Sequence, residues 1–173
     1  MSIYLLRHGE SEDNLAKLIA GHRQIQLTEK GRQQARDAAN GAPKFDRIIA
    51  SPLKRAHQTA IEFAQASGFE VHKIELDDRL KERGYGVLEG TLKEKIDFEK
   101  LEETEGVESL EKVAKRVRSL FDELKVKEEA ILLVTHNGPV RIMHLFIDGT
   151  ELKDIEHSKR YPNAELIKLD INQ

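Results

Sequence analysis

Three short apolar segments, each followed by a polar turn and then by a helical pattern, restrict the fold of this sequence more than any other feature. They cover residues 3–6, 47–50 and 130–135. Short apolar runs of this kind are typical of strands buried on both faces of a parallel sheet, with helices as the crossover connections. A weaker segment, 71–74, and a last apolar segment, 165–171, are also expected to form strands.

Helical signals occupy the gaps between these strands. Thr28 is a suitable N-cap for the first helix, and Gly68 is expected to end the second, which follows Pro52. The third has apolar side chains spaced to form one buried face, and Gly138-Pro139 opens the fourth. The expected helices cover about residues 29–40, 53–67, 110–124 and 138–146.

Strands that alternate with helices predict an α/β fold, a three-layer sandwich with a mostly parallel central sheet flanked by helices. A length of 173 residues fits one domain, residues 1–173, and we see no linker or internal repeat. The acidic stretch 99–108 is expected to be a mobile, solvated surface connection.

Composition excludes several classes of function. The formal net charge of -3, without a cluster of basic residues, argues against nucleic acid or anionic membrane as a partner. The absence of cysteine excludes disulfides, thiolate catalysis and cysteine-ligated metals. No apolar stretch approaches the roughly 20 residues that span a bilayer, and the first residues do not resemble a signal peptide. We therefore expect a cytoplasmic protein.

Two histidines and two arginines follow the three main strands. Arg7 and His8 follow the first, Arg55 follows the second, and His136 follows the third. Ligands gather outside the carboxyl ends of parallel strands, so these side chains should meet at one edge of the sheet. Arginine offers a planar fork of donors to phosphate oxygens, a neutral imidazole can attack phosphorus, and a protonated one can stabilise transferred charge. A single histidine at a strand end is more often structural, but the four residues together favour phosphoryl chemistry.

Ordered motifs along the chain resemble those of the histidine phosphatase (phosphoglycerate mutase-like) superfamily. Several such blocks in order are far more specific than an Arg-His-Gly triplet, and the resemblance runs from about residue 3 to residue 170. The blocks are Arg7-His8-Gly9-Glu10-Ser11 with Asn14, Gly21 with Leu27-Thr28-x-x-Gly31, Ser51-Pro52-Leu53-Lys54-Arg55, Leu80-x-Glu82-Arg83-x-Tyr85-Gly86-x-Leu88-x-Gly90, and Thr135-His136-Asn137-Gly138.

The resemblance implies a role for each matching residue. His8 would become phosphorylated, and Arg7, Arg55 and His136 would hold the phosphoryl oxygens. Glu82 would protonate the leaving oxygen and later deprotonate the incoming water; from spacing alone it cannot be distinguished from Asp77 or Asp78 in a solvated charge cluster. No metal or other cofactor is implied, because arginine and imidazolium supply the positive charge. The expected substrate-binding residues are Asn14, Gly21, His22, Arg23, Tyr85 and Asn137, with a contribution from segment 91–108.

Two reactions share this chemistry, and the sequence contains arguments for both. Leu88, where many phosphatases of the family have tryptophan, favours a mutase. The mutases of the family, however, have a longer insertion rich in basic residues and a C-terminal tail. The insertion here, from Asp97 to Glu108, is short and acidic, and we expect Lys93 and Lys95 to be the only cations near the site. Gln24 and Asn137 replace the aspartate and glycine common in the family.

We therefore expect a metal-independent phosphatase that acts on a small phosphomonoester in an open site. The first alternative is a phosphoglycerate mutase, which would need 2,3-bisphosphoglycerate as a primer. The second is a non-catalytic, phosphate-binding regulatory module, although His8, Glu82 and His136 are all present. The expected partner is a small phosphorylated metabolite, or a phosphoprotein that a short lid would admit. Substrate identity and oligomeric state stay open.

Overall fold

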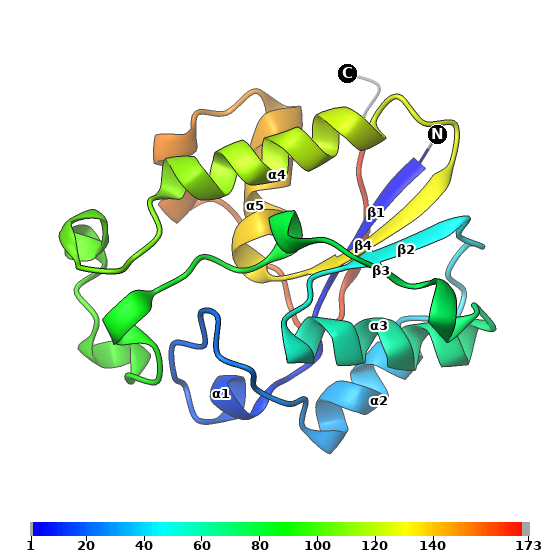
Figure 1. Ribbon diagram of the computed structural model, residues 1–173, viewed down its shortest axis with the longest axis horizontal. Coiled ribbons are helices and arrows are strands. Elements are labelled where there is room, and N and C mark those ends of the chain that lie inside the picture. Colours follow the sequence, from blue (N-terminus) through cyan, green and yellow to red (C-terminus); the bar gives the residue numbers. More distant parts are fainter. Residues whose placement is uncertain (1, 171–173) are drawn as a thin grey trace.

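The computed structural model describes residues 2–170 and has an α/β fold in three layers (Figure 1). Its sheet has five strands in the order β3-β2-β4-β1-β5. Neighbours among the first four strands run parallel, whereas β5 pairs antiparallel with β1 at the sheet edge. The expected fold class is therefore confirmed. The strands are β1 (Ser2–Arg7), β2 (Arg47–Ala50), β3 (Glu75–Leu76), β4 (Ala130–Thr135) and β5 (Leu166–Lys168).

Helices cover both faces of the sheet, with α4 and α5 on one side and α2 and α3 on the other (Figure 1). Strand residues alternate between two apolar clusters because successive side chains point to opposite faces. In β4, Ile131 and Leu133 pack in the cluster with α4 and α5, while Leu132 and Val134 pack in the cluster with α3. The helices are α1 (Glu12–Leu15), α2 (Glu29–Asp37), α3 (Lys54–Ser67), α4 (Leu110–Leu124) and α5 (Asn137–Asp148).

Two predicted helix ends are confirmed, the start of α2 at Thr28 and the end of α3 at Gly68. The Thr28 hydroxyl accepts a hydrogen bond from the Gly31 amide and so caps α2. Gly68 ends α3 in the left-handed conformation, with a φ of 75°. Within the described residues, no helix combines the length and apolar character needed to cross a membrane.

Two strand predictions need correction. The segment 71–74 is not a strand, because Val71–Lys73 forms a 3-10 helix and the strand β3 follows it at Glu75–Leu76. Both residues of β3 are exposed, so this edge strand lacks the buried apolar run by which strands are recognised. The last strand covers only Leu166–Lys168 of the predicted 165–171, and residue 171 lies outside the described residues.

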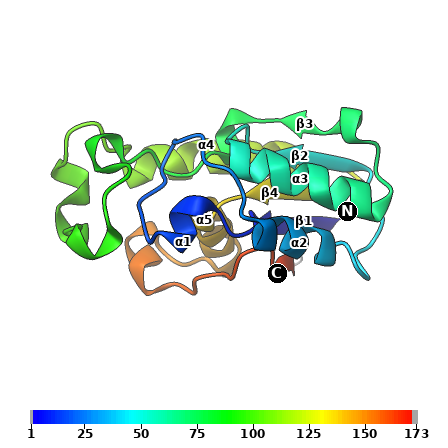
Figure 2. The same ribbon diagram turned by 90° about the horizontal axis from the view of Figure 1, so that it is seen from below.

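Most residues of the segment 99–108 are exposed, as expected, but the segment is more than a solvated connection. Phe98–Glu103 forms a 3-10 helix in which Leu101 is buried, and Glu102 and Glu108 pair with arginines outside the segment. Its acidic charges therefore attach it to the rest of the molecule. In both views this green segment lies beyond the carboxyl ends of the strands, where the candidate site is found (Figures 1 and 2).

Candidate active site

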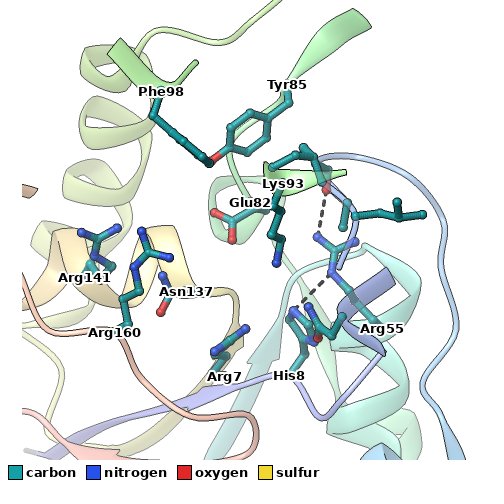
Figure 3. A pocket seen from close by; sticks show the side chains of 15 residues that line it. Arg7, His8, Arg55, Glu82, Tyr85, Lys93, Phe98, Asn137, Arg141 and Arg160 are labelled. Atoms are coloured by element: carbon teal, nitrogen blue, oxygen red, sulfur yellow. Dashed lines mark hydrogen bonds between the residues drawn. The ribbon is translucent and has the colours of Figure 1, made fainter. Parts of the chain in front are cut away.

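A cavity of about 190 Å³ lies at the carboxyl ends of the central strands (Figure 3). Its wall includes four of the five predicted catalytic side chains, Arg7, His8, Arg55 and Glu82. The fifth, His136, is fully buried beside His8, with 5.1 Å between the two ring centroids. Strands β1 and β4 and the start of α3 thus place residues from distant parts of the sequence around one small space.

The hydrogen bonds of His8 determine which nitrogen carries its proton. Nδ1 lies 2.7 Å from the Gly9 carbonyl oxygen, which can only accept, so Nδ1 is protonated. The Arg55 Nε–H donates to Nε2 at 3.3 Å, so Nε2 has a free electron pair. Burial, and then the positive charges of Arg55 and Arg7, hold the pKa of His8 well below its ordinary value of 6.5. His8 is therefore a neutral imidazole with a lone pair on Nε2.

Arg55 is almost fully buried and holds the loop that follows α1. Its guanidinium donates to the Gly21 carbonyl at 2.8 Å and to the Arg23 carbonyl at 3.1 Å, in addition to His8. Burial lowers the pKa of Arg55 to about 10, so the side chain stays charged at neutral pH. The buried Thr59 hydroxyl, one turn further along α3, donates to the Arg55 carbonyl at 2.7 Å and accepts from the Gly9 amide at 3.0 Å. Thr59 therefore fixes the loop of His8 to the helix of Arg55.

The His136 ring is oriented by a serine at the end of β2. Nε2 lies 2.8 Å from the Ser51 hydroxyl, and Nδ1 has no hydrogen-bond partner in the described part of the chain. Burial, Arg55 and His8 lower the pKa of His136 well below 6.5. The predicted protonated form is thus not favoured by these surroundings alone. A phosphoryl dianion would act in the opposite direction to the cations and favour protonation.

Glu82 reaches the first turn of α5. Its Oε1 accepts from the Arg83 amide at 3.1 Å and its Oε2 from the Gly138 amide at 3.4 Å. A Cβ atom at Gly138 would lie 2.3 Å from Oε1, far inside normal contact distance. Glycine at this position is therefore what lets the carboxylate approach the helix.

The backbone that carries Glu82 is held by Arg116 of α4. This guanidinium donates to the carbonyls of Arg79, Lys81 and Glu82 at 2.6–3.0 Å. It also forms an ion pair of 2.9 Å with Glu108, whose carboxylate accepts from the Gly84 amide at 3.1 Å. Sequence reasoning missed Arg116, because on an amphipathic helix it looks like any surface arginine.

Four of the six predicted substrate-binding residues line the cavity: Asn14, Gly21, Tyr85 and Asn137. The Asn14 Oδ1 accepts from the Ser11 amide and from Asn163, both at 3.2 Å, so its NH₂ group is the part of the side chain that could donate to a ligand. Tyr85 stands at the upper edge of the cavity in Figure 3, opposite His8.

His22 and Arg23 do not belong to the cavity wall. The His22 Nε2 lies 2.8 Å from the Glu82 carbonyl oxygen. Arg23 forms a 3.1 Å ion pair with Asp13, while its own carbonyl binds Arg55. Both residues therefore brace loops around the site, and their predicted contact with substrate has no support in this geometry.

Three further cations border the cavity: Lys93, Arg141 and Arg160. Lys93 follows the Glu82 loop, Arg141 lies on α5, and Arg160 precedes β5 (Figure 3). The expectation that Lys93 and Lys95 are the only nearby cations is therefore wrong, because Arg141 and Arg160 line the cavity and Lys95 does not. The two arginines could not be found from motif spacing, because they are more than 50 residues from Glu82 in the sequence.

Among the side chains that the structure describes, which exclude those of residues 156 and 157, no three or more of His, Asp and Glu are grouped so that they could hold a metal ion. Metal independence itself stays a prediction.

Comparisons with known proteins agree with the motifs. The sequence model of the histidine phosphatase superfamily (branch 1) matches residues 3–173. Phosphoserine phosphatase 1 of Hydrogenobacter thermophilus is 32% identical over 168 residues, which cover 88% of this chain and 78% of that protein. A 2,3-bisphosphoglycerate-dependent phosphoglycerate mutase of Cytophaga hutchinsonii is 30% identical over 194 residues, covering 98% of this chain and 90% of that protein.

Solved structures give the same relationship. A mycobacterial glucosyl-3-phosphoglycerate phosphatase superposes with a TM-score of 0.82 at 25% identity, covering 96% of this chain and 88% of that chain. Proteins similar to this chain thus include phosphatases and a mutase.

Proposed function

Because the chain belongs to the histidine phosphatase superfamily (branch 1), we propose that it is a phosphatase that acts on a small phosphomonoester through a phosphohistidine at His8. The cavity of about 190 Å³ is smaller than the roughly 300–1,000 Å³ of sites for drug-sized ligands, which favours a small metabolite. The names of the two phosphatase relatives also refer to small phosphorylated metabolites.

The observation that carries the proposal is the protonation state of His8. Its Nδ1–H is bound to the Gly9 carbonyl, and its Nε2 electron pair lies on the side of Arg55. A nucleophilic imidazole needs this arrangement, because only an unprotonated nitrogen can attack phosphorus. The low pKa of His8 keeps that form populated in neutral and mildly acidic solution.

In the first step, His8 Nε2 attacks the phosphorus atom in line with the ester oxygen. The N–P bond forms as the P–O bond to the leaving group breaks, and the electron pair of that bond stays on the leaving oxygen. The protonated carboxyl of Glu82 gives its proton to this oxygen, so the alcohol leaves neutral. Arg7 and Arg55 stabilise the equatorial phosphoryl oxygens, where charge accumulates.

In the second step, the Glu82 carboxylate takes a proton from a water molecule whose oxygen attacks the phosphorus. The N–P bond breaks and its electron pair returns to Nε2. The products are inorganic phosphate, a protonated Glu82 and the original His8. Two arginines and His136, which the phosphoryl dianion would help to protonate, supply the positive charge that a metal ion supplies in other phosphatases. We therefore propose that turnover needs no metal.

A mutase is the second candidate, and the cations at the cavity edge favour it. With Arg141 and Arg160 added to Lys93, the cavity has the charge to hold a second acidic group, so one argument against a mutase is lost. The short segment 91–108 still favours hydrolysis, because a mutase must exclude water from the phosphohistidine.

The experiment is phosphate release from a panel of phosphomonoesters in the presence of a chelator, beside a bisphosphoglycerate-primed mutase assay. We expect release that a chelator does not reduce and that is lost in His8→Asn. The matched control is His57→Asn, which removes a histidine from α3 outside the cavity wall. Mutase turnover above hydrolysis would reject the phosphatase in favour of the second candidate. Equal release by wild type and His8→Asn would reject the covalent mechanism.

A further inference from the structure

A turn at residues 161–164, just before β5, holds the end of β1 in place. The Tyr161 carbonyl accepts a hydrogen bond from the Arg7 guanidinium, and the Ala164 amide donates to the Arg7 carbonyl at 2.9 Å. None of the motifs found in the sequence falls in this turn. Figure 3 shows Arg160, the residue before it, among the side chains that line the cavity. A segment without a motif thus reaches the strand end that carries the proposed nucleophile.

Asn163 uses both protons of its side-chain amide on the site. Its Nδ2 donates to the His8 carbonyl at 2.8 Å and to the Asn14 Oδ1 at 3.2 Å. The NH₂ group of an asparagine has only two protons, so both are used. Asparagine is common in turns because its side chain can bond its own backbone. Here the partners lie 155 and 149 residues away, so a role in the turn alone does not explain the two bonds.

The bond to Asn14 determines which end of the Asn14 amide can meet a ligand. The Asn14 Oδ1 also accepts from the Ser11 amide at 3.2 Å, so both acceptor positions of this oxygen are occupied and the NH₂ group is left to donate. Asn14 lines the cavity, where a phosphoryl dianion needs donors. Turned by half a rotation, the same amide would present its oxygen to the dianion and repel it.

The same turn orients a second amide of the cavity wall. The Asn137 Oδ1 accepts from the Tyr161 amide at 3.1 Å, and Asn137 also lines the cavity. Both asparagines of the wall thus have their oxygen held by residues 161–164. Asn163 does this with its side chain rather than its backbone, so a substitution can remove the contact.

From this geometry we propose that Asn163 is a positioning residue for the reaction at His8. Its amide holds the His8 backbone and directs the NH₂ group of Asn14 toward the phosphoryl oxygens. The inference rests on the proposed phosphatase function and adds to it a residue that lies outside the cavity wall and acts through its neighbours.

Asn163→Asp is the sharpest variant, because the new side chain has nearly the same shape, suits a turn and cannot donate when ionised. Its carboxylate would face the Asn14 Oδ1, so the Asn14 amide is expected to turn its NH₂ group to the carboxylate and its oxygen to the cavity. Asn163→Ala removes the donors without adding a charge, and the Ser11 amide still binds Asn14 there. Asn40, which is exposed and follows α2, provides the matched controls Asn40→Asp and Asn40→Ala.

The readout is the dissociation constant of inorganic phosphate, measured by titration calorimetry on the folded variants in a double-mutant cycle with Asn14→Ala. In the wild type, Asn14→Ala should weaken phosphate binding about ten-fold, because a hydrogen bond to a charged group is lost. In the Asn163→Asp background the same change should weaken binding less than about two-fold, because the NH₂ group no longer faces the anion. In the Asn163→Ala background the loss should be about three-fold.

Both Asn40 variants should keep the wild-type effect of Asn14→Ala. A role of Asn163 in stability alone would lower the melting temperature and leave the two losses independent. An undiminished effect of Asn14→Ala in both Asn163 backgrounds would therefore overturn the inference, as would an Asn14→Ala variant that binds phosphate like the wild type. A wild type that binds no phosphate at millimolar concentration would overturn it too. Failure of both Asn163 variants to fold would assign the residue to stability, with the same consequence.

Hydrolysis of p-nitrophenyl phosphate, measured alongside in the wild type and in His8→Asn, separates this inference from the proposed function. Hydrolysis that depends on His8, together with independent losses in the cycle, rejects the positioning role alone. Coupled losses without any hydrolysis reject the phosphatase and leave Asn163 as the residue that orients Asn14 in a phosphate-binding site.

Discussion

Substitution of Gly138 by alanine is expected to damage catalysis without damaging the fold. The added Cβ would lie 2.3 Å from Glu82 Oε1, whereas ordinary contact begins at about 3.4 Å. The carboxylate must therefore move by the difference, about 1.1 Å. It is the free end of a flexible side chain, so it can move while the backbone stays in place. Alanine also favours helix over glycine by about 1 kcal/mol, and Gly138 lies in the first turn of α5.

A displacement of about 1 Å at a catalytic group can cost roughly 10²-fold in rate. We expect kcat/KM of Gly138→Ala to fall by about that factor for an alkyl phosphate, whose leaving oxygen needs the proton of Glu82. The loss should be much smaller for p-nitrophenyl phosphate, whose leaving group departs without protonation. The melting temperature, measured by circular dichroism, should stay the same or rise.

A double-mutant cycle with Glu82→Gln tests whether the effect passes through this carboxylate. If it does, adding Gly138→Ala to Glu82→Gln should cost little more activity, because the two changes remove the same function. Full additivity of the two losses would refute the reasoning, as would equal losses for the two substrates or a fall in stability that accounts for the lost activity.

Three further results are expected. The pKa values of His8 and His136 are lower in the folded protein than the 6.5 of an unfolded chain. As the pH falls, the unfolded state therefore binds protons first, and the free energy of unfolding should decrease below about pH 6.5. The expected decrease is roughly 1.4 kcal/mol per pH unit for each ring. Urea unfolding across pH should show this slope reduced in His8→Asn; an unchanged slope contradicts it. Arg116→Gln should lower kcat about ten-fold through the loosened Glu82 loop, while Lys115→Gln on the exposed face of α4 has no effect in the same assay. Thr59→Val should destabilise the fold by about 1–3 kcal/mol in urea, because the buried Gly9 amide loses its acceptor; a change below about 0.5 kcal/mol would argue against that bond.

The central strands could be predicted from the sequence because strands buried on both faces require continuous runs of apolar residues. The strands β2 and β4 have the predicted bounds, and every residue of β4 after Ala130 is buried. The strand β3 has no such signal, since it is short, exposed and held only at the sheet edge by β2. Apolar residues in the sequence therefore cannot predict a strand that is defined only by its backbone pairing with a neighbouring strand.

The residues of the site likewise fall into those that sequence motifs identify and those that only the folded structure reveals. His8, Arg55 and Glu82 could be named because ordered motifs mark them, and the cavity brings them together. Arg116 and Arg160 have no motif, and their part in the site depends on the folding of distant segments onto the Glu82 loop. Ion pairs between segments remote in sequence, such as that of Arg116 with Glu108, are visible only in three dimensions.

The central claim is that a phosphoryl group passes through His8, and trapping it is the most direct test. The protein is mixed with excess p-nitrophenyl phosphate for milliseconds, quenched in alkali, in which phosphohistidine survives, and digested for mass spectrometry. The account predicts the mass of one phosphoryl group on the peptide containing His8, removed by mild acid and absent from His8→Asn. Steady phosphate release with no phosphorylated histidine at any quench time, or with the label on another residue, would contradict it.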